Sequence, residues 1–237
     1  MFLSGIQLQP RLDSRLKRSG MTKFSKFWII SNMMQELLVA TRNKKKLEEI
    51  KDLLKDCPLK ITSLADYPDL PEIEEDGKTF QANAIKKAAT IALYTKKFTM
   101  GEDSGLEVKA LDNEPGIFSA RFAGIGATDE KNNAKLLKLL KSVPLRKRQA
   151  RYRCCVALVD GKRIIDVVSG SCLGLIALKL KGKNGFGYDP LFLIPRFGKT
   201  FGELPSEVKS KISHRARALK KFKGVLKAHL SHPPRKV

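Results

Sequence analysis

Cysteine is scarce in this sequence, and its spacing does not favour a metal site or a disulfide framework. Only four of the 237 residues are cysteines, and none forms a C-x-x-C pair; they are Cys57, Cys154, Cys155 and Cys172. If Cys154 and Cys155 lie on a strand, they point to opposite faces of it. A zinc site or a disulfide-stapled domain is therefore disfavoured, and a reducing compartment fits better.

Long apolar runs are also missing, and acidic residues are few. No run approaches the ~20 residues that a membrane-spanning helix needs. The chain has 24 acidic against 46 basic residues, a formal net charge of +22. Such an excess suits nucleic acid, an acidic membrane surface or a polyanionic small substrate, but it is spread along the whole chain, as on an ordinary solvated surface. The sequence has no RNA-recognition signature, zinc-finger spacing or aromatic-rich basic strand, and no internal repeat.

The first 35 residues differ from the rest. Residues 1–34 hold six basic residues and one acid, and the apolar stretch 27–30 is too short for a signal peptide. Three interpretations stay open: a disordered extension, an organelle-targeting segment, or sequence upstream of a later start at Met21, Met33 or Met34. We expect a folded domain over 36–230, followed by a C-terminal tail at 231–237.

From residue 36 onward, short apolar runs alternate with amphipathic stretches, which is typical of an α/β domain. Asp160-Gly161 is a hairpin signal between two of the runs. Ser206 and Ser213 can each cap a helix. The pattern predicts strands at 37–40, 59–64, 98–100, 151–160, 164–169 and 191–194, a further pairing segment at 106–111, and helices before Pro58, over 80–94, over 132–140 and after each of the two serines.

The segment TRNKKK at 41–46 lies between a predicted strand and a predicted helix. Backbone N–H groups at a helix start bind anions, and neighbouring lysines add positive charge. The segment therefore predicts a phosphate-binding loop, although it is not a Walker A loop. The alternative is that Thr41 or Asn43 caps the helix and the lysines are solvated.

Two acidic groups follow, at 72–76 in a proline-rich loop and at Glu102-Asp103 after an apolar run. Carboxylates from two loops suit Mg²⁺, which keeps several waters and binds one or two carboxylates together with substrate phosphates. The alternative is that these acids are solvated loop residues. Between the two groups, Asp103 is the stronger candidate, because it is held between Gly101 and Gly105.

Two later segments carry unusual combinations of residues. In NGFGYDPLF at 184–192, glycines, aromatic rings and an acid stand together before an apolar run, which could hold a flat heterocycle. The alternative is a glycine-rich turn whose aromatic residues belong to the core. In KSKISHR at 209–215, a His-Arg pair begins the last helix, where anion binding is again favoured; alternatively, the pair is surface next to a helix cap.

Taken in order, these stretches resemble one family far more specifically than any of them does alone. ATRNKKKLEEI, EEDGKTFQANAIKKA, GEDSGLEVKALDNEPGIFSARFAG, NGFGYDPLF, GKTFGEL and EVKSKISHRARAL together resemble the inosine/xanthosine triphosphate pyrophosphatases, the Ham1-like family, over about residues 36–228. The resemblance implies an elongated mixed sheet with flanking helices and two lobes around a deep central cleft. It also implies Mg²⁺-dependent hydrolysis of ITP, dITP and XTP to the monophosphate and pyrophosphate, which removes deaminated purines from nucleotide pools.

The resemblance further implies a homodimer. We expect the protein in the cytoplasm, where nucleic-acid precursors are made, and, from the missing signatures and apolar runs, without a specific nucleic-acid or membrane partner. Carried over residue by residue, the resemblance makes Asp103 and Lys87 catalytic and gives Glu74 and Asp103 to the metal. The residues that it implies for substrate binding are Thr41, Asn43, Lys46, Asn83, Ser104, Phe186, Gly187, Tyr188, Asp189, Lys209, His214 and Arg215.

Three positions depart from the family pattern. Lys45 stands where glycine is common, Ala82 where glutamate often precedes Asn83, and Glu102 where aspartate is frequent. Three other functions stay open: a nucleic-acid-binding protein, an enzyme acting on modified pyrimidine triphosphates, and a non-catalytic nucleotide sensor.

Overall fold

The structure, a computed structural model, describes residues 35–231, and the expectations for residues 1–34 and for most of the predicted tail lie outside these residues. The strands are β1 (Gln35–Val39), β2 (Leu59–Ser63), β3 (Thr99–Val108), β4 (Gln149–Asp160), β5 (Arg163–Ile176), β6 (Phe192–Ile194) and β7 (Lys199–Thr200). The α-helices are α3 (Lys44–Leu53), α4 (Phe80–Thr95), α5 (Asp129–Leu139), α6 (Ser206–Ile212) and α7 (His214–Ser231). None of the helices within 35–231 is long and apolar enough to cross a membrane.

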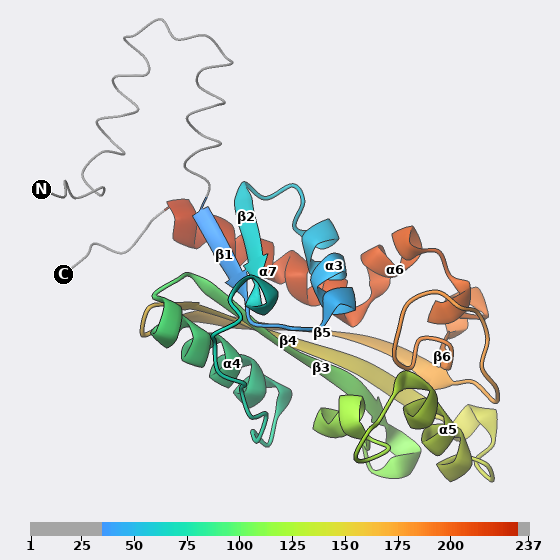
Figure 1. Cartoon of the computed structure of the whole chain (residues 1–237). Coiled ribbons are helices and arrows are strands. Elements are labelled where there is room, and N and C mark those ends of the chain that lie inside the picture. The colour runs from blue at the N-terminus through green and yellow to red at the C-terminus, as the bar shows by residue number, and fades with distance from the viewer. Residues whose placement is uncertain (1–34, 232–237) are drawn as a thin grey trace, which may run out of the picture. The chain divides into compact units, whose positions relative to one another are not determined.

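The strands form one mixed seven-stranded sheet in the order β2-β1-β3-β4-β5-β6-β7, which confirms the predicted α/β fold (Figure 1). β1 runs parallel to β3, whereas β3 to β7 are antiparallel neighbours. The predicted hairpin joins β4 to β5, and Gly161 at its turn has a φ of +59°, which suits a residue without a Cβ. As predicted, Ser213 caps α7, since its Oγ accepts from the N–H of Ala216 at 3.2 Å. The predicted cap at Ser206 was wrong, because Ser206 is the first residue of α6 and Pro205 holds the N-cap position.

The segment GEDSG at 101–105 lies inside a strand, so the prediction of a strand that ends at residue 100 was wrong. β3 continues to Val108 because it pairs with β4 residue by residue along its whole length. Gly101 and Gly105 suggested a loop, but their lack of a side chain serves packing. A Cβ on Gly101 would lie 2.1 Å from the carbonyl oxygen of Ala84 in α4, and one on Gly105 would lie 2.4 Å from Ser119 Oγ.

Two helices cover opposite faces of the sheet, and each packs against a strand glycine. α4 packs against Gly101 of β3, and α7 packs against Gly170 of β5, where a Cβ would lie 2.3 Å from the carbonyl oxygen of His214. Figure 1 shows these helices on either side of the long central strands. Because side chains alternate along a strand, Asp103 faces α4 and Ser104 faces α7.

We predict that Gly101→Ala destabilises the fold by about 2 kcal/mol or more, because a backbone carbonyl cannot move aside as a flexible side chain can. Gly224→Ala is a matched control on α7, since a Cβ there meets nothing within 4 Å. The control should be neutral or slightly stabilising, because alanine favours a helix. Thermal melts of the two variants check this, and equal melting temperatures would contradict the close contact.

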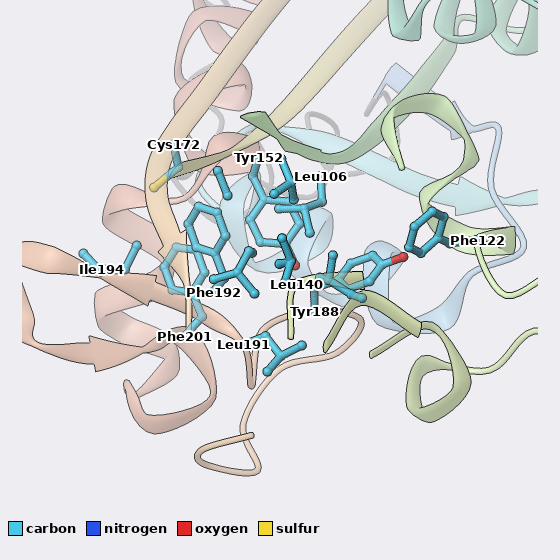
Figure 2. Close-up of a cluster of buried hydrophobic side chains, with 14 of the residues drawn as sticks. Leu106, Phe122, Leu140, Tyr152, Cys172, Tyr188, Leu191, Phe192, Ile194 and Phe201 are labelled. Carbon is cyan, nitrogen blue, oxygen red and sulfur yellow. The ribbon is translucent and has the colours of Figure 1, made fainter. Parts of the chain in front are cut away.

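A large apolar cluster lies where β3, β4 and β5 meet the segment after Gly187 (Figure 2). The aromatic ring of Tyr152 lies 4.5 Å from that of Phe192, and the rings of Phe192 and Phe201 stack at 5.4 Å. Tyr188 and Leu191 are buried in the same cluster. The apolar run after GFGYDP is therefore core, and it fixes the position of the turn that precedes it.

A crevice lies beside β3, where Asn43 and Lys46 at the start of α3 and Ser104 and Gly105 of β3 line a pocket. β1 pairs with β3 at Leu38 and Val39, and the N–H of Ala40 still donates to the carbonyl oxygen of Met100; the chain then leaves the sheet at residues 41–43 to enter α3. β1 continues to β2 on one side, while β3 lies on its other side, so the strand order changes direction here. Ligands of α/β proteins bind at such a point, outside the carboxyl ends of the strands.

Candidate active site

The segment 41–46 forms the first wall of this crevice. Asn43 is the N-cap of α3, and its Oδ1 accepts from the N–H of Lys46 at 3.0 Å. Thr41 Oγ1 accepts from the N–H of Asn43 at 3.2 Å. The capping alternative is thus correct for these side chains, yet Asn43 and Lys46 also line a pocket, and the lysine-rich helix start remains suited to an anion.

On the α4 side of β3, three charged side chains form what we call the Asp103 cluster: Glu75, Lys87 and Asp103. Lys87 Nζ lies 3.1 Å from Glu75 Oε1 and 3.2 Å from Asp103 Oδ1. Asn83 is fully buried; its Nδ2 donates to Asp103 Oδ2 at 3.1 Å, and its Oδ1 accepts from the N–H of Gly77 at 2.8 Å. These bonds tie the proline-rich loop to β3. One acid from each predicted group, Glu75 and Asp103, therefore contacts the same ammonium group of Lys87.

The member of the loop that reaches this cluster is Glu75, and not Glu74, to which the resemblance assigned the metal. Glu74 is exposed, whereas Glu75 is half-buried. Neighbouring residues in an extended segment point in opposite directions, so a shift of one position reverses which of them faces the strand. The structure therefore does not bring Glu74 to Asp103, and Glu75 is the better candidate for a metal ligand.

Burial controls the protonation behaviour of the Asp103 cluster. Burial raises the pKa of Asp103, and the nearby ammonium groups of Lys87 and Lys46 offset this only in part. Burial alone would lower the pKa of Lys87, but attraction to Asp103 and Glu75 outweighs it, and the net shift is upward. Lys87 therefore stays charged, and Asp103 is a stronger proton acceptor than an exposed aspartate.

A second ionic group lies on the α7 side of β3. Glu102 is buried, and its carboxylate lies 3.1 Å from Lys46 Nζ and 3.1 Å from Arg215 Nη2. Although burial would raise the pKa of Glu102, the charges of Lys46 and Arg215 hold it well below its usual range. Arg215 Nη2 also lies 3.1 Å from Ser104 Oγ. Glu102 thus positions two predicted substrate-binding cations.

Those cations border a pocket of about 110 Å³, which we call the base pocket. The volume is well below the roughly 300–1,000 Å³ of a drug-sized site, so it suits one small planar group and not a whole nucleotide. Ten residues predicted to bind substrate line it, namely Asn43, Lys46, Ser104, Phe186, Gly187, Tyr188, Asp189, Lys209, His214 and Arg215. Thr41, Asn83 and the Asp103 cluster are not among its lining residues.

The GFGYD turn at one side of the base pocket owes its shape to its glycines. Gly185 and Gly187 have φ values of +76° and +62°, in the left-handed region that favours glycine. Asp189 closes the turn, since its Oδ2 accepts from the N–H of Phe186 at 2.9 Å. Asp129 Oδ2 accepts from the N–H of Gly187 at 2.8 Å and anchors the turn to the start of α5.

Phe186 presents its ring beside two cations. Lys209 Nζ lies 4.8 Å and Arg215 Cζ 5.7 Å from the ring centroid, within cation–π range. Glu49 of α3 holds both cations: its carboxylate lies 2.6 Å from Lys209 Nζ, and it also pairs closely with Arg215. Lys209 contacts Asp189 Oδ2 at 2.6 Å as well. This network gives the half-buried aromatic ring a fixed orientation.

The other two predicted base-contacting side chains have different positions. Tyr188 donates its hydroxyl hydrogen to the carbonyl oxygen of Ser119 at 2.8 Å, so it forms the pocket wall and does not read a ring edge. His214 is buried and stacks on Tyr152 at 4.5 Å between ring centroids. Burial holds the pKa of His214 well below its usual value. Its Nδ1 has no hydrogen-bond partner among residues 35–231, so a neutral imidazole nitrogen is free for a ligand.

Sequence reasoning assigned no individual role to four residues that position this site: Glu49, Glu75, Asp129 and Asn133. Glu49 looks like an ordinary helix acid, and Asp129 like an acid placed to stabilise the helix start. Asn133 Nδ2 donates to the carbonyl oxygen of Gly187 at 2.9 Å, but no local motif marks it. Only Glu75 carried a signal, its place immediately before Asp76-Gly77.

Comparison with known proteins gives the same assignment. The sequence profile of the Ham1 family matches residues 37–225. The chain belongs to the Ham1 family. A protein of Geobacter sulfurreducens named dITP/XTP pyrophosphatase is 51 % identical over 199 residues, which cover 83 % of this chain and 97 % of the relative. A protein of the same name from Desulforamulus reducens is 49 % identical over 191 residues, which cover 81 % of this chain and 95 % of the relative.

Solved structures of Ham1 proteins share the fold. A HAM1 protein from Coxiella burnetii aligns with a TM-score of 0.75 at 38 % identity, covering 82 % of this chain and 100 % of that protein. The Staphylococcus aureus Ham1 protein aligns with a TM-score of 0.74 at 36 % identity and the same coverage. The family membership and the mixed sheet with flanking helices that the resemblance implied are thus confirmed.

Proposed function

We propose that this Ham1 family protein hydrolyses the purine triphosphates ITP, dITP and XTP to the monophosphate and pyrophosphate. The observation that most supports this is the adjacency of Ser104 and Asp103 on β3. Ser104 lines the base pocket on the α7 face, and Asp103 belongs to the acidic cluster on the α4 face. A nucleotide with its base in the pocket can extend its phosphates through the crevice beside β3 towards Asp103. The dITP/XTP pyrophosphatase names of its relatives agree with this substrate class.

The residues of the Asp103 cluster fit a divalent cation. Glu75 Oε1 and Asp103 Oδ1 both lie within 3.2 Å of Lys87 Nζ, so the two carboxylates are close enough together to share a divalent cation beside that ammonium group. Among residues 35–231 no group of three or more His, Cys, Asp or Glu side chains is placed to hold a metal alone. Mg²⁺ does not require one, since substrate phosphates and water complete its coordination. Bound there, it would neutralise charge on the phosphate oxygens.

The protein groups divide the remaining work among them. Lys46 and the N–H groups at the start of α3 hold the phosphate chain in the crevice. Asp103, with its raised pKa, orients a water molecule and accepts its proton as the water oxygen attacks the α-phosphorus. Lys87 keeps the Asp103 carboxylate in place through its contact at 3.2 Å. The bond from the α-phosphorus to the bridging oxygen breaks, and pyrophosphate leaves.

The position of attack can be tested with ITP in oxygen-18 water. We expect the label in the monophosphate, because the water attacks the α-phosphorus, and no label in pyrophosphate. Mass spectrometry of both products checks this, with a parallel reaction in EDTA to test the requirement for Mg²⁺. Label in inorganic phosphate together with a diphosphate product would contradict the proposal.

The one-residue difference between Glu74 and Glu75 gives a matched pair of variants. We expect Glu75→Gln to lower kcat about 10- to 100-fold, since it removes one of two carboxylates facing the cation position. Glu74→Gln changes an exposed side chain and should leave kcat within about twofold of wild type. Steady-state pyrophosphate release at saturating Mg²⁺ measures both. The reverse order of effects would restore Glu74 as the metal ligand.

Selectivity for the base follows from the donors around the pocket. Hypoxanthine and xanthine carry a 6-keto oxygen, which accepts a hydrogen bond from Arg215 or His214, whereas the 6-amino group of adenine is a donor. A site built around such a bond can reject the wrong partner by ~10⁴-fold, because it leaves a buried group unpaired. Guanine is also a 6-keto base, so weak hydrolysis of GTP requires in addition a pocket that leaves its 2-amino group unpaired.

Lys45 and Ala82, which depart from the family pattern, are both exposed, so activity is still expected. The homodimer and the cytoplasmic location stay predictions, and sedimentation would test the former.

A further inference from the structure

The outer edge of β5 borders a basic groove that the proposed hydrolysis does not use. β6 pairs with only the last two residues of β5, so within residues 35–231 most of this edge has no further strand beside it. A groove of about 750 Å³ runs along it. Its lining, which we call the β5 groove, consists of Arg151, Arg153, Ser169, Gly170, Ser171, Arg217, Lys220 and Lys221, five of which are cations and none an acid.

The cations come from two elements, β4 and α7, and converge on the edge. Arg151 and Arg153 alternate in register on β4 and so point to the same face of the sheet. Arg217 and Lys221 reach the edge from α7 and donate to the carbonyl oxygens of Ser171 and Ser169, each at 2.8 Å. Lys220 is exposed between them.

The charge of this groove is only partly neutralised by neighbouring acids. Glu107 lies 2.7 Å from Arg151 and 3.4 Å from Arg153 and so offsets one of these two charges. Arg217 and Lys221 are held by backbone carbonyls, which carry no net charge, and therefore keep their full positive charge. Charged side chains on an edge strand also prevent edge-to-edge aggregation, which is the simplest alternative use for them.

We propose that the β5 groove binds the phosphate backbone of nucleic acid without reading its sequence. Guanidinium groups match phosphate oxygens with two parallel hydrogen bonds, and the groove has three of them. No aromatic side chain lines it, so it has no platform on which to stack bases and recognise them. No large apolar side chain lines it either, which argues against insertion into a membrane surface. The net charge of +22 adds long-range attraction for a polyanion.

This inference is independent of the hydrolysis proposed above, because the groove shares no lining residue with the base pocket. It also respects the expectation of no specific nucleic-acid partner, since a backbone contact carries no sequence preference. The consequence would be a protein that is retained near nucleic acid while it hydrolyses free nucleotides.

The test is fluorescence anisotropy of a labelled single-stranded oligonucleotide with the full chain over a series of salt concentrations. The groove variant carries Arg217→Gln, Lys220→Gln and Lys221→Gln. The matched control carries Arg146→Gln, Lys138→Gln and Lys141→Gln, which remove the same charges from exposed positions around the end of α5. We expect the affinity of the groove variant to fall about 10-fold or more. The slope of its log binding constant against log salt concentration should become shallower by up to ~2, while the control stays close to wild type.

ITP hydrolysis reports on folding, and we expect both triple variants to retain wild-type turnover because none of the six residues lies in the base pocket or the Asp103 cluster. Equal loss of affinity in both variants would overturn the proposal and assign binding to diffuse charge. No binding by wild type at low salt would also overturn it. So would binding to phosphatidylserine vesicles without binding to the oligonucleotide.

Discussion

Asp103→Asn should lower the turnover of ITP by about 10³-fold or more while the folded structure persists. The amide has nearly the shape of the carboxylate but cannot accept a proton from water, a role worth roughly 10²–10⁴-fold. It also loses its charge attraction to Lys87, which lies 3.2 Å away. Steady-state pyrophosphate release gives the effect on kcat.

Asp76→Asn is the matched control for this variant. Asp76 belongs to the acidic loop that carries Glu75, but it is exposed and pairs with Lys86 at 2.6 Å instead of facing β3. Its variant should keep turnover close to wild type. Thermal melts of both proteins separate loss of catalysis from loss of folding. Turnover near wild type in Asp103→Asn would remove Asp103 from the chemistry.

Arg215→Met should destabilise the protein by about 3–5 kcal/mol, because it leaves Glu102 buried without one of its two counterions. Arg215 is 1 % exposed and contacts Glu102, Glu49 and Ser104. For a chain of this size, the loss corresponds to a fall in melting temperature of roughly 10 °C or more. The folded fraction should also lose its preference for ITP over ATP, because a donor to the 6-keto oxygen is gone.

Two further variants define the cause of this loss. Glu102→Gln combined with Arg215→Met removes the uncompensated charge and should recover part of the stability. Arg217→Met, two residues along α7, changes an exposed side chain and should have little effect on the melting temperature. If Arg215→Met melts like wild type, the buried ion pair does not stabilise the fold.

Local patterns predicted most of the elements because each has a clear start or end signal. Asn43 and Thr79 are the N-caps of α3 and α4, and their side chains accept from the N–H groups of Lys46 and Ala82. Polar residues of this kind are expected immediately before a helix with apolar residues at regular spacing. Gly161 marks the β4–β5 hairpin, because glycine readily adopts the positive φ that the turn requires. Most of the predicted substrate-binding residues gather at one pocket because they follow a strand or begin a helix beside a single crevice.

Tertiary packing decided what local patterns could not. The glycines of GEDSG suggest a turn, but they allow α4 to approach β3, so the strand continues through Asp103 and sends it and Ser104 to opposite faces. Which of Glu74 and Glu75 faces Asp103 depends on a register that the loop sequence leaves open. The position of Glu49 between Lys209 and Arg215 depends on residues about 160 positions apart.

The most direct test of the central claim is pyrophosphate release from ITP, XTP, dITP, GTP, ATP and dUTP, each measured with Mg²⁺ and with EDTA. We predict strong release from ITP, XTP and dITP in Mg²⁺, weak release from the other three, and little from any of them in EDTA. Equal release from all six triphosphates would contradict the assignment of the base pocket. Undiminished release in EDTA would contradict the assignment of Glu75 and Asp103 to a divalent cation.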